Sequence, residues 1–198
     1  MAGKVEARKA LLREALIDAA EAQIKLGGLS TLKARPLAQA AGCALGAIYN
    51  IFDDLDALVM AVNARTFRCL GAFVSARVTE AADQSPNTQL VIMSHAYLHF
   101  AADHTFLWRA LFDLEMSVDG TVPEWYLLEL RAVFGLIAAP LAQLFPDMKR
   151  DELDLMVRAL FSAVHGIVLL GLERRISAVP QDQIETMLSQ ILREIGNS

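Results

Sequence analysis

The stretch STLKARPLAQAAGCALGAIYNIFDDLDAL, Ser30–Leu58, carries the clearest structural signal in this chain of 198 residues. Ala38 is a small residue of the kind needed where two helices cross, and Gly42 follows where the chain must turn with positive φ. Apolar residues at helical offsets place one face of each helix inward, and they are Leu37, Ala41, Cys43, Ile48 and Ile51. The pattern predicts a helix-turn-helix, and an ordinary helical hairpin is the alternative.

The second helix of this motif is predicted over Ala44–Ile51, with an outward face in the position where a recognition helix touches DNA. Only Tyr49 and Asn50 on that face can make directional hydrogen bonds, whereas the other residues offer apolar or backbone contact. The outward residues are Ala44, Leu45, Gly46, Ala47, Tyr49 and Asn50. Because this helix is poor in polar side chains, we expect DNA affinity to depend heavily on the N-terminal arm.

The net charge of −5 divides unevenly along the chain. Residues 1–50 hold seven Lys or Arg against four Asp or Glu, which gives +3, and residues 51–198 hold eleven against nineteen, which gives −8. A basic end can approach phosphates while an acidic remainder resists nonspecific binding to DNA. Lys4, Arg8 and Lys33 are therefore candidate phosphate contacts, and a solvated helix end without a target is the alternative.

Composition places the chain among packed, mainly helical proteins. It is 55% hydrophobic, with 6 prolines and 11 glycines. No uninterrupted apolar run of about 18 residues is present, so no membrane span is expected. The N-terminus lacks the apolar core of a secretion signal, and two cysteines, Cys43 and Cys69, suit a reducing cytoplasm.

Residues 12–63 resemble the N-terminal DNA-binding domain of TetR-family transcriptional regulators. The resemblance rests on Ala19-Ala20, Gly27-Gly28, Leu37-Ala38, Ala41-Gly42 and the run Ile48–Phe52. It implies an all-α protein of about nine helices, with a three-helix helix-turn-helix domain over residues 1–54. Residues 55–198 would form a helical ligand-binding and dimerisation domain. The family also implies that Thr31 donates a hydrogen bond to a DNA phosphate.

The second domain is predicted to begin with one long helix over residues 55–82, which the family uses to link its two domains. Further helices are predicted over residues 88–103, 105–117, 123–145, 151–178 and 180–195, with a loop at 118–121. Residues 96–113 and 160–172 resemble a TetR subgroup named for a Trp-His-Gly signature. His165-Gly166 matches that signature, and Phe161 stands where the tryptophan is expected.

Family members typically sense a small molecule in this domain, so we expect a pocket lined by aromatic and histidine side chains. The candidate ligand residues are His95, His99, Trp108, Phe112, Met116, Trp125, Tyr126 and His165. Aromatic residues at helical spacing are more often core than pocket. No cofactor is predicted, and the sequence does not identify the effector.

A metal site is the competing interpretation of the histidines. His95, His99 and Asp103 recur every four residues on one helix face, a spacing that can hold a transition metal. One helix face supplies too few ligands by itself, so hydrogen-bonded histidines are favoured and no metal is predicted.

The last two predicted helices carry more apolar surface than one small domain easily hides. The resembling family builds a four-helix dimer interface from this pair, and an internal core is the alternative. The candidate interface residues are Phe161, Val164, Val168, Leu172, Met187, Leu188 and Ile191. A twofold dimer would present two recognition helices to a palindromic site on double-stranded DNA.

These observations predict a cytoplasmic, homodimeric transcriptional regulator, a repressor released when a small-molecule effector binds. No set of residues resembles a catalytic nucleophile and base, a phosphate loop or a dinucleotide site, so an enzyme is not expected. Two alternatives stay open: a helical protein-interaction module with weakened DNA binding, and a histidine-based metalloprotein or hydrolase.

Overall fold

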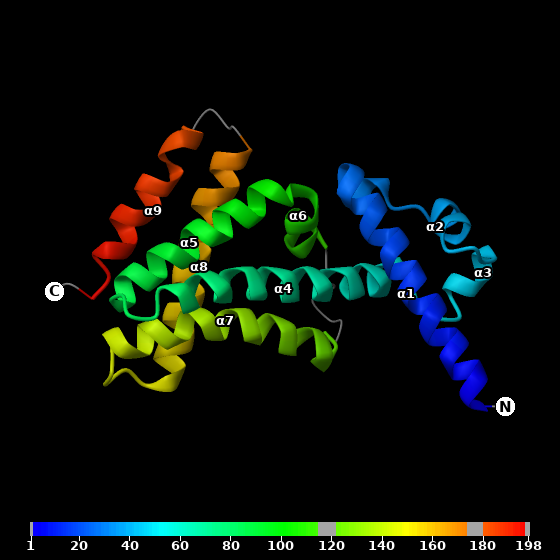
Figure 1. Ribbon diagram of the computed structural model, residues 1–198, viewed down its shortest axis with the longest axis horizontal. Coiled ribbons are helices and arrows are strands. Elements are labelled where there is room, and N and C mark those ends of the chain that lie inside the picture. The colour runs from blue at the N-terminus through cyan, green and yellow to red at the C-terminus, as the bar shows by residue number, and fades with distance from the viewer. Residues whose placement is uncertain (1, 115–121, 174–179, 197–198) are drawn as a thin grey trace. The chain divides into compact units, whose positions relative to one another are not determined.

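The computed structural model describes residues 2–114, 122–173 and 180–196. These residues form nine α-helices and two short 3-10 helices without any strand, which confirms the all-α prediction (Figure 1). The elements are α1 (Ala2–Gly27), η1 (Leu29–Thr31), α2 (Ala34–Ala40), α3 (Leu45–Ile48), α4 (Leu55–Glu80), α5 (Pro86–Asp103), α6 (Thr105–Asp113), α7 (Glu124–Leu144), α8 (Arg150–Leu172), η2 (Gln181–Gln183) and α9 (Ile184–Arg193). The predicted loop at 118–121 lies outside the described residues.

The chain packs as two compact units. The N-terminal unit comprises Met1–Phe67 with His104–Leu127, and the C-terminal unit comprises Arg68–Asp103 with Leu128–Ser198. Helix α4 gives its first half to one unit and its second half to the other. The domain boundary predicted after residue 54 rests on the helix-turn-helix motif alone, and the N-terminal unit as packed also takes in α6.

The described residues of the N-terminal unit form a hydrophobic core where α1, α2, α3, the first half of α4 and α6 meet. Leu37, Ala38 and Ile48 of the predicted motif are buried in it, while Ala41, Cys43 and Ile51 pack at its edge. Gly42 has φ of 64°, the left-handed conformation that the turn requires. The remaining large buried residues of this core include Leu16, Ile17, Ile24, Phe52, Leu58 and Val62.

The starts of α2 and α4 show how local chemistry sets these helices. Lys33 occupies the N-terminal cap position of α2, and Ser30 and Thr31 belong to η1 before it. Pro36 falls in the first turn of α2, where its missing N–H costs nothing. At α4, the Asp54 carboxylate accepts a hydrogen bond of 2.7 Å from the backbone N–H of Ala57.

Arg65 joins α4 to α1 through three carboxylates. Its guanidinium donates to Glu14, to Asp18 at 2.6 Å and to Glu21 at 3.4 Å. Burial alone would lower the pKa of Arg65, but the hydrogen bonds and charges of Asp18 and Glu14 outweigh it and raise the pKa. Three carboxylates of α1 therefore share one cation of α4.

In the C-terminal unit, α5 packs against α9, and α8 packs against both. The side-chain amide of Asn87 donates to the carbonyl oxygens of Leu192 at 3.0 Å and Ile195 at 2.7 Å, which satisfies acceptors at the end of α9. Where α8 meets α9, Gly171 lies directly against the fully buried Ile184, so a larger residue at 171 has no room.

Three helices carry more apolar sequence than expected. The sequence predicts no membrane span, yet by length and composition alone α4, α7 and α8 are each long and apolar enough to cross a membrane. That prediction required an uninterrupted apolar run, whereas these helices keep high mean hydropathy despite one or two charges. In α7 and α8 only 17% and 22% of the most apolar stretch is buried, so both helices leave apolar surface uncovered in the single chain.

Candidate DNA-binding surface and ligand cavity

The recognition segment is shorter as a regular helix than predicted. Helix α3 covers only Leu45–Ile48, with Ala44 at its N-terminal cap position. After α3 the chain continues in hydrogen-bonded turns. The backbone N–H of Asn50 donates to the carbonyl oxygen of Ala47 at 3.3 Å, and that of Phe52 donates to the carbonyl oxygen of Ile48 at 2.9 Å. The segment ends there because Phe52 turns into the core, where it is 4% exposed.

The outward face of this segment is open to solvent. Leu45 is 43% exposed and Tyr49 is 51% exposed, whereas Ile48 between them is fully buried. Ala44, Gly46 and Asn50 are also exposed, and Ala47 is half-buried. The burial pattern therefore matches the predicted division into inward and outward residues, while contact with DNA stays a prediction.

Among the predicted phosphate contacts, Thr31 has a different environment from the charged residues. Its hydroxyl lies 2.7 Å from the carbonyl oxygens of both Gln23 and Gly28, so its proton is already donated within the chain. A DNA phosphate would have to displace that hydrogen bond. The remaining candidates, Lys4, Arg8 and Lys33, are exposed.

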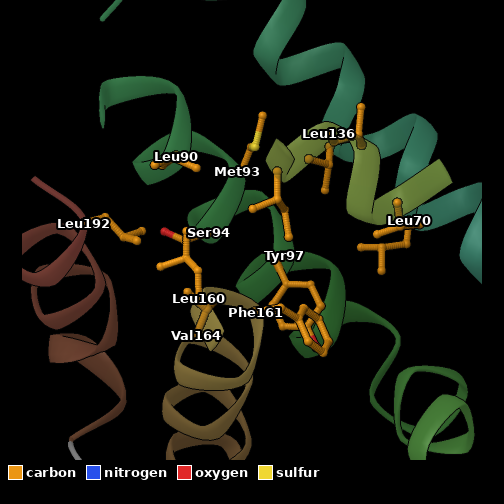
Figure 2. A pocket seen from close by; sticks show the side chains of 13 residues that line it. Leu70, Leu90, Met93, Ser94, Tyr97, Leu136, Leu160, Phe161, Val164 and Leu192 are labelled. Atoms are coloured by element: carbon orange, nitrogen blue, oxygen red, sulfur yellow. The ribbon is translucent and has the colours of Figure 1, made fainter. Parts of the chain in front are cut away.

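The C-terminal unit contains an apolar cavity of about 50 Å³. Figure 2 shows its side chains converging from α4, α5, α7, α8 and α9. Two of the lining residues, Ser94 and Tyr97, are polar, and none is charged. The lining consists of Leu70, Val74, Leu90, Met93, Ser94, Tyr97, Val133, Leu136, Ile137, Leu160, Phe161, Val164 and Leu192.

His165 lies next to this cavity and is hydrogen-bonded to Tyr97, one of the lining residues. The Tyr97 hydroxyl and His165 Nδ1 are 2.8 Å apart, and the Phe161 ring stacks on the imidazole with centroids 5.6 Å apart. Burial lowers the pKa of His165 from its ordinary value of 6.5, so the ring is neutral at pH 7. A neutral imidazole can accept the Tyr97 proton or donate to its oxygen.

None of the predicted ligand residues that the structure describes lines this cavity. Trp108 and Tyr126 are core residues of the N-terminal unit, 1% and 3% exposed. Phe112 and Trp125, also in that unit, are 40% and 42% exposed. Met116 lies outside the described residues. The residues that do line the cavity are mainly aliphatic, and their helical spacing did not distinguish them from ordinary core.

His95 and His99 hold α5 to α9 by hydrogen bonds. His99 Nε2 lies 2.7 Å from the Glu185 carboxylate, and His95 Nε2 lies 3.0 Å from the Ser189 hydroxyl. In the described part of the chain no three His, Cys, Asp or Glu side chains come together in a way that could hold a metal ion. These contacts favour the hydrogen-bonded interpretation over the metal site.

The predicted dimer residues fall into three environments. Val168 and Leu188 are fully buried within their own chain, so they offer no surface to a partner. Phe161 and Val164 line the cavity. Leu172 and Met187 are half-buried, and Ile191 is 44% exposed. The helical spacing identified the apolar residues of these helices. It did not show which of them are buried within the single chain and which stay exposed.

A helix-turn-helix unit joined through one continuous helix to a helical unit with an apolar cavity defines a class of ligand-responsive DNA-binding proteins. The tetracyclin repressor-like C-terminal domain family matches residues 90–195. The chain belongs to the TetR family of transcriptional regulators. The match does not confirm the Trp-His-Gly subgroup, which stays a prediction.

Solved structures share the fold. A protein of unknown function from Rhodococcus sp. RHA1 is 24% identical, with a TM-score of 0.71 over 91% of this chain and 93% of that one. RolR, solved in complex with resorcinol, is 17% identical, with a TM-score of 0.70 over 96% and 95%. The fatty acid degradation regulator FadR from Bacillus halodurans is 16% identical, with a TM-score of 0.66 over 90% and 96%. No curated protein matches the sequence.

Proposed function

We propose that the chain is a cytoplasmic, homodimeric repressor that binds a palindromic operator and is released by a small-molecule effector. The observation that carries this proposal is the apolar cavity in the C-terminal unit, whose wall includes Leu70 and Val74 of α4. The same helix begins in the N-terminal unit beside the recognition segment. A continuous helix that belongs to both units gives a physical route by which an occupied cavity favours another arrangement of the DNA-binding units.

The cavity favours an uncharged, largely apolar effector with few hydrogen-bonding groups. No charged side chain lines it, and a charge buried there without a partner would be costly. The Ser94 hydroxyl donates to the carbonyl oxygen of Val91 at 2.7 Å, and Tyr97 is bonded to His165. The resorcinol bound by RolR is an uncharged aromatic molecule of the kind that such a lining suits.

The volume of the cavity supports coupling between effector binding and conformation. A cavity of about 50 Å³ is much smaller than the roughly 300–1,000 Å³ of a typical ligand pocket. An aromatic effector must therefore part the surrounding helices in order to enter. The DNA-binding form then corresponds to the closed cavity, and the effector favours an open form with lower affinity for the operator.

The test is fluorescence-anisotropy binding of the purified full chain to the intergenic DNA upstream of its own coding region, at two salt concentrations. We expect saturable, salt-sensitive binding that Tyr49→Ala and Lys33→Ala both weaken. Resorcinol and other uncharged aromatic molecules, added to the complex, serve as effector probes. At least one is expected to lower the affinity for DNA at least tenfold.

Absence of specific binding at low salt would contradict the proposal and favour the protein-interaction module. Its exposed Leu45 and Tyr49 would then be contacts for another protein. Binding to DNA that no uncharged molecule changes, but that a charged one does, would overturn the proposed effector class and leave the DNA-binding function standing.

A further inference from the structure

A second cleft lies in the N-terminal unit, beside the recognition segment. One face of α1 forms one wall with Glu6, Lys9 and Arg13, and Asn50 and Ile51 form the other. The three α1 residues are spaced by three and four positions, so they lie on one side of the helix. The cleft is therefore a continuous surface between α1 and the end of the recognition segment.

The two cations of this cleft have no anionic partner in the described part of the chain. Neither Lys9 nor Arg13 makes an ion pair or hydrogen bond there. Arg13 is held instead by the Phe52 ring, with its guanidinium carbon 4.5 Å from the ring centroid. Because Phe52 is 4% exposed and fixed in the core, this contact orients the guanidinium without using its N–H donors.

The charges of α1 are divided along its length. From residue 14 onward, Glu14, Asp18 and Glu21 surround Arg65, and Glu21 also pairs with Lys25 at 2.6 Å. Before residue 14 the helix has a single carboxylate, Glu6. The cations there have no ion-pair partner in the described part of the chain, and they are Lys4, Arg8, Lys9 and Arg13. Positive potential therefore gathers at the end of α1 that borders Asn50.

We propose that this cleft receives a DNA backbone phosphate, with Lys9, Arg13 and the Asn50 amide as donors. The inference rests on the proposed DNA-binding function and adds a site to it. A guanidinium held over a ring keeps its N–H groups available for phosphate oxygens. Such a contact positions the recognition segment without reading bases, and it supplies affinity that the polar-poor outward face of α3 lacks.

Salt dependence measures this contact directly, because each phosphate contact adds about 0.9 to the slope of log affinity against log salt. We expect Arg13→Met and Lys9→Met each to reduce the slope, and the two substitutions together to reduce it by about that amount. Each should weaken binding to the upstream intergenic DNA and to a random duplex by the same factor, since phosphates carry no sequence information. Lys9→Met leaves the Arg13 contact with Phe52 in place, so it separates charge from packing.

Two further variants sharpen the test. Glu6→Gln removes the one carboxylate of the cleft and should strengthen binding to both duplexes, a gain that misfolding does not produce. Lys25→Met removes the same charge at the other end of α1 and should leave the slope unchanged. If Arg13→Met and Lys9→Met both bind DNA with the affinity and salt slope of the wild type, the proposed phosphate site is wrong and the DNA-binding function still stands. Failure of the wild type to bind either duplex would instead overturn the DNA-binding function on which it rests.

Discussion

At the scale of single residues, His165 is a titratable group in direct contact with two residues that line the cavity. It is hydrogen-bonded to Tyr97 at 2.8 Å and stacked on Phe161, and both of these residues line the cavity. Its burial makes protonation unfavourable in the folded chain. Because the folded chain disfavours protonated His165, the free energy of unfolding of this unit should depend on pH.

Acidification should destabilise the protein through His165. Burial lowers the pKa of His165 below 6.5, so the unfolded chain binds more protons than the folded one as pH falls. Its full stabilising contribution is present above pH 6.5 and is lost as pH falls through the lowered pKa. Urea unfolding of the wild type and His165→Asn at pH 7.5 and 5.5 measures this contribution, and the variant should lose less stability on acidification.

If His165→Asn loses as much stability on acidification as the wild type, proton binding at His165 does not contribute.

At the scale of elements, the contact between α8 and α9 depends on a glycine. Gly171 is buried in α8, and a Cβ there would clash with Ile184, the fully buried first residue of α9. Ile184 is held by its own helix and by the core, so it has little freedom to yield.

Gly171→Ala should therefore destabilise the chain although alanine is the better helix former. Overpacking of a core costs about 1–3 kcal/mol, which exceeds the roughly 1 kcal/mol that Gly→Ala contributes inside a helix. Gly135→Ala in α7 is the matched control, because no atom lies within 4 Å of the Cβ it adds. Chemical denaturation should show a loss for the first and a gain for the second; equal gains would mean that Ile184 moves aside at no cost.

At the scale of the whole molecule, α8 and α9 leave apolar side chains exposed. Leu155 and Leu170 of α8 are 68% and 45% exposed, and Ile191 of α9 is 44% exposed. Ala159, Ser162 and Ala163, on the exposed side of α8, are small enough to allow close approach of another helix. A second copy of the chain is the partner that the proposed function requires, because a palindromic operator presents two half-sites.

The full chain should have a mass in solution of twice 21.7 kDa. Leu170→Glu and Ile191→Glu place a charge on the proposed interface and should shift the protein towards monomer, as measured by light scattering after size exclusion. Leu26→Glu, at the end of α1, is the control, since Leu26 is 82% exposed and lies in the other unit. A monomeric wild type would contradict the proposed dimer. A dimer that persists in both variants would mean that the interface does not include Leu170 and Ile191.

The sequence by itself determined the elements of this protein. Ala38, Gly42 and the inward residues of the helix-turn-helix predicted its core and its turn, because those features depend on spacing within about twenty residues. The order and type of the later helices followed from the same local periodicity. Family membership followed as well, since the resemblance rests on motifs that lie close together in the chain.

Only the tertiary structure decided which apolar residues became core, cavity or surface. Val168, Val164 and Leu170 share α8 and similar chemistry, yet the first is fully buried, the second lines the cavity and the third is exposed. Local spacing cannot separate them, because their burial depends on which of the five cavity-forming helices lies opposite each one. The Phe52 contact that orients Arg13 likewise joins residues far apart in the sequence, so only the packing of α1 against the recognition segment brings them together.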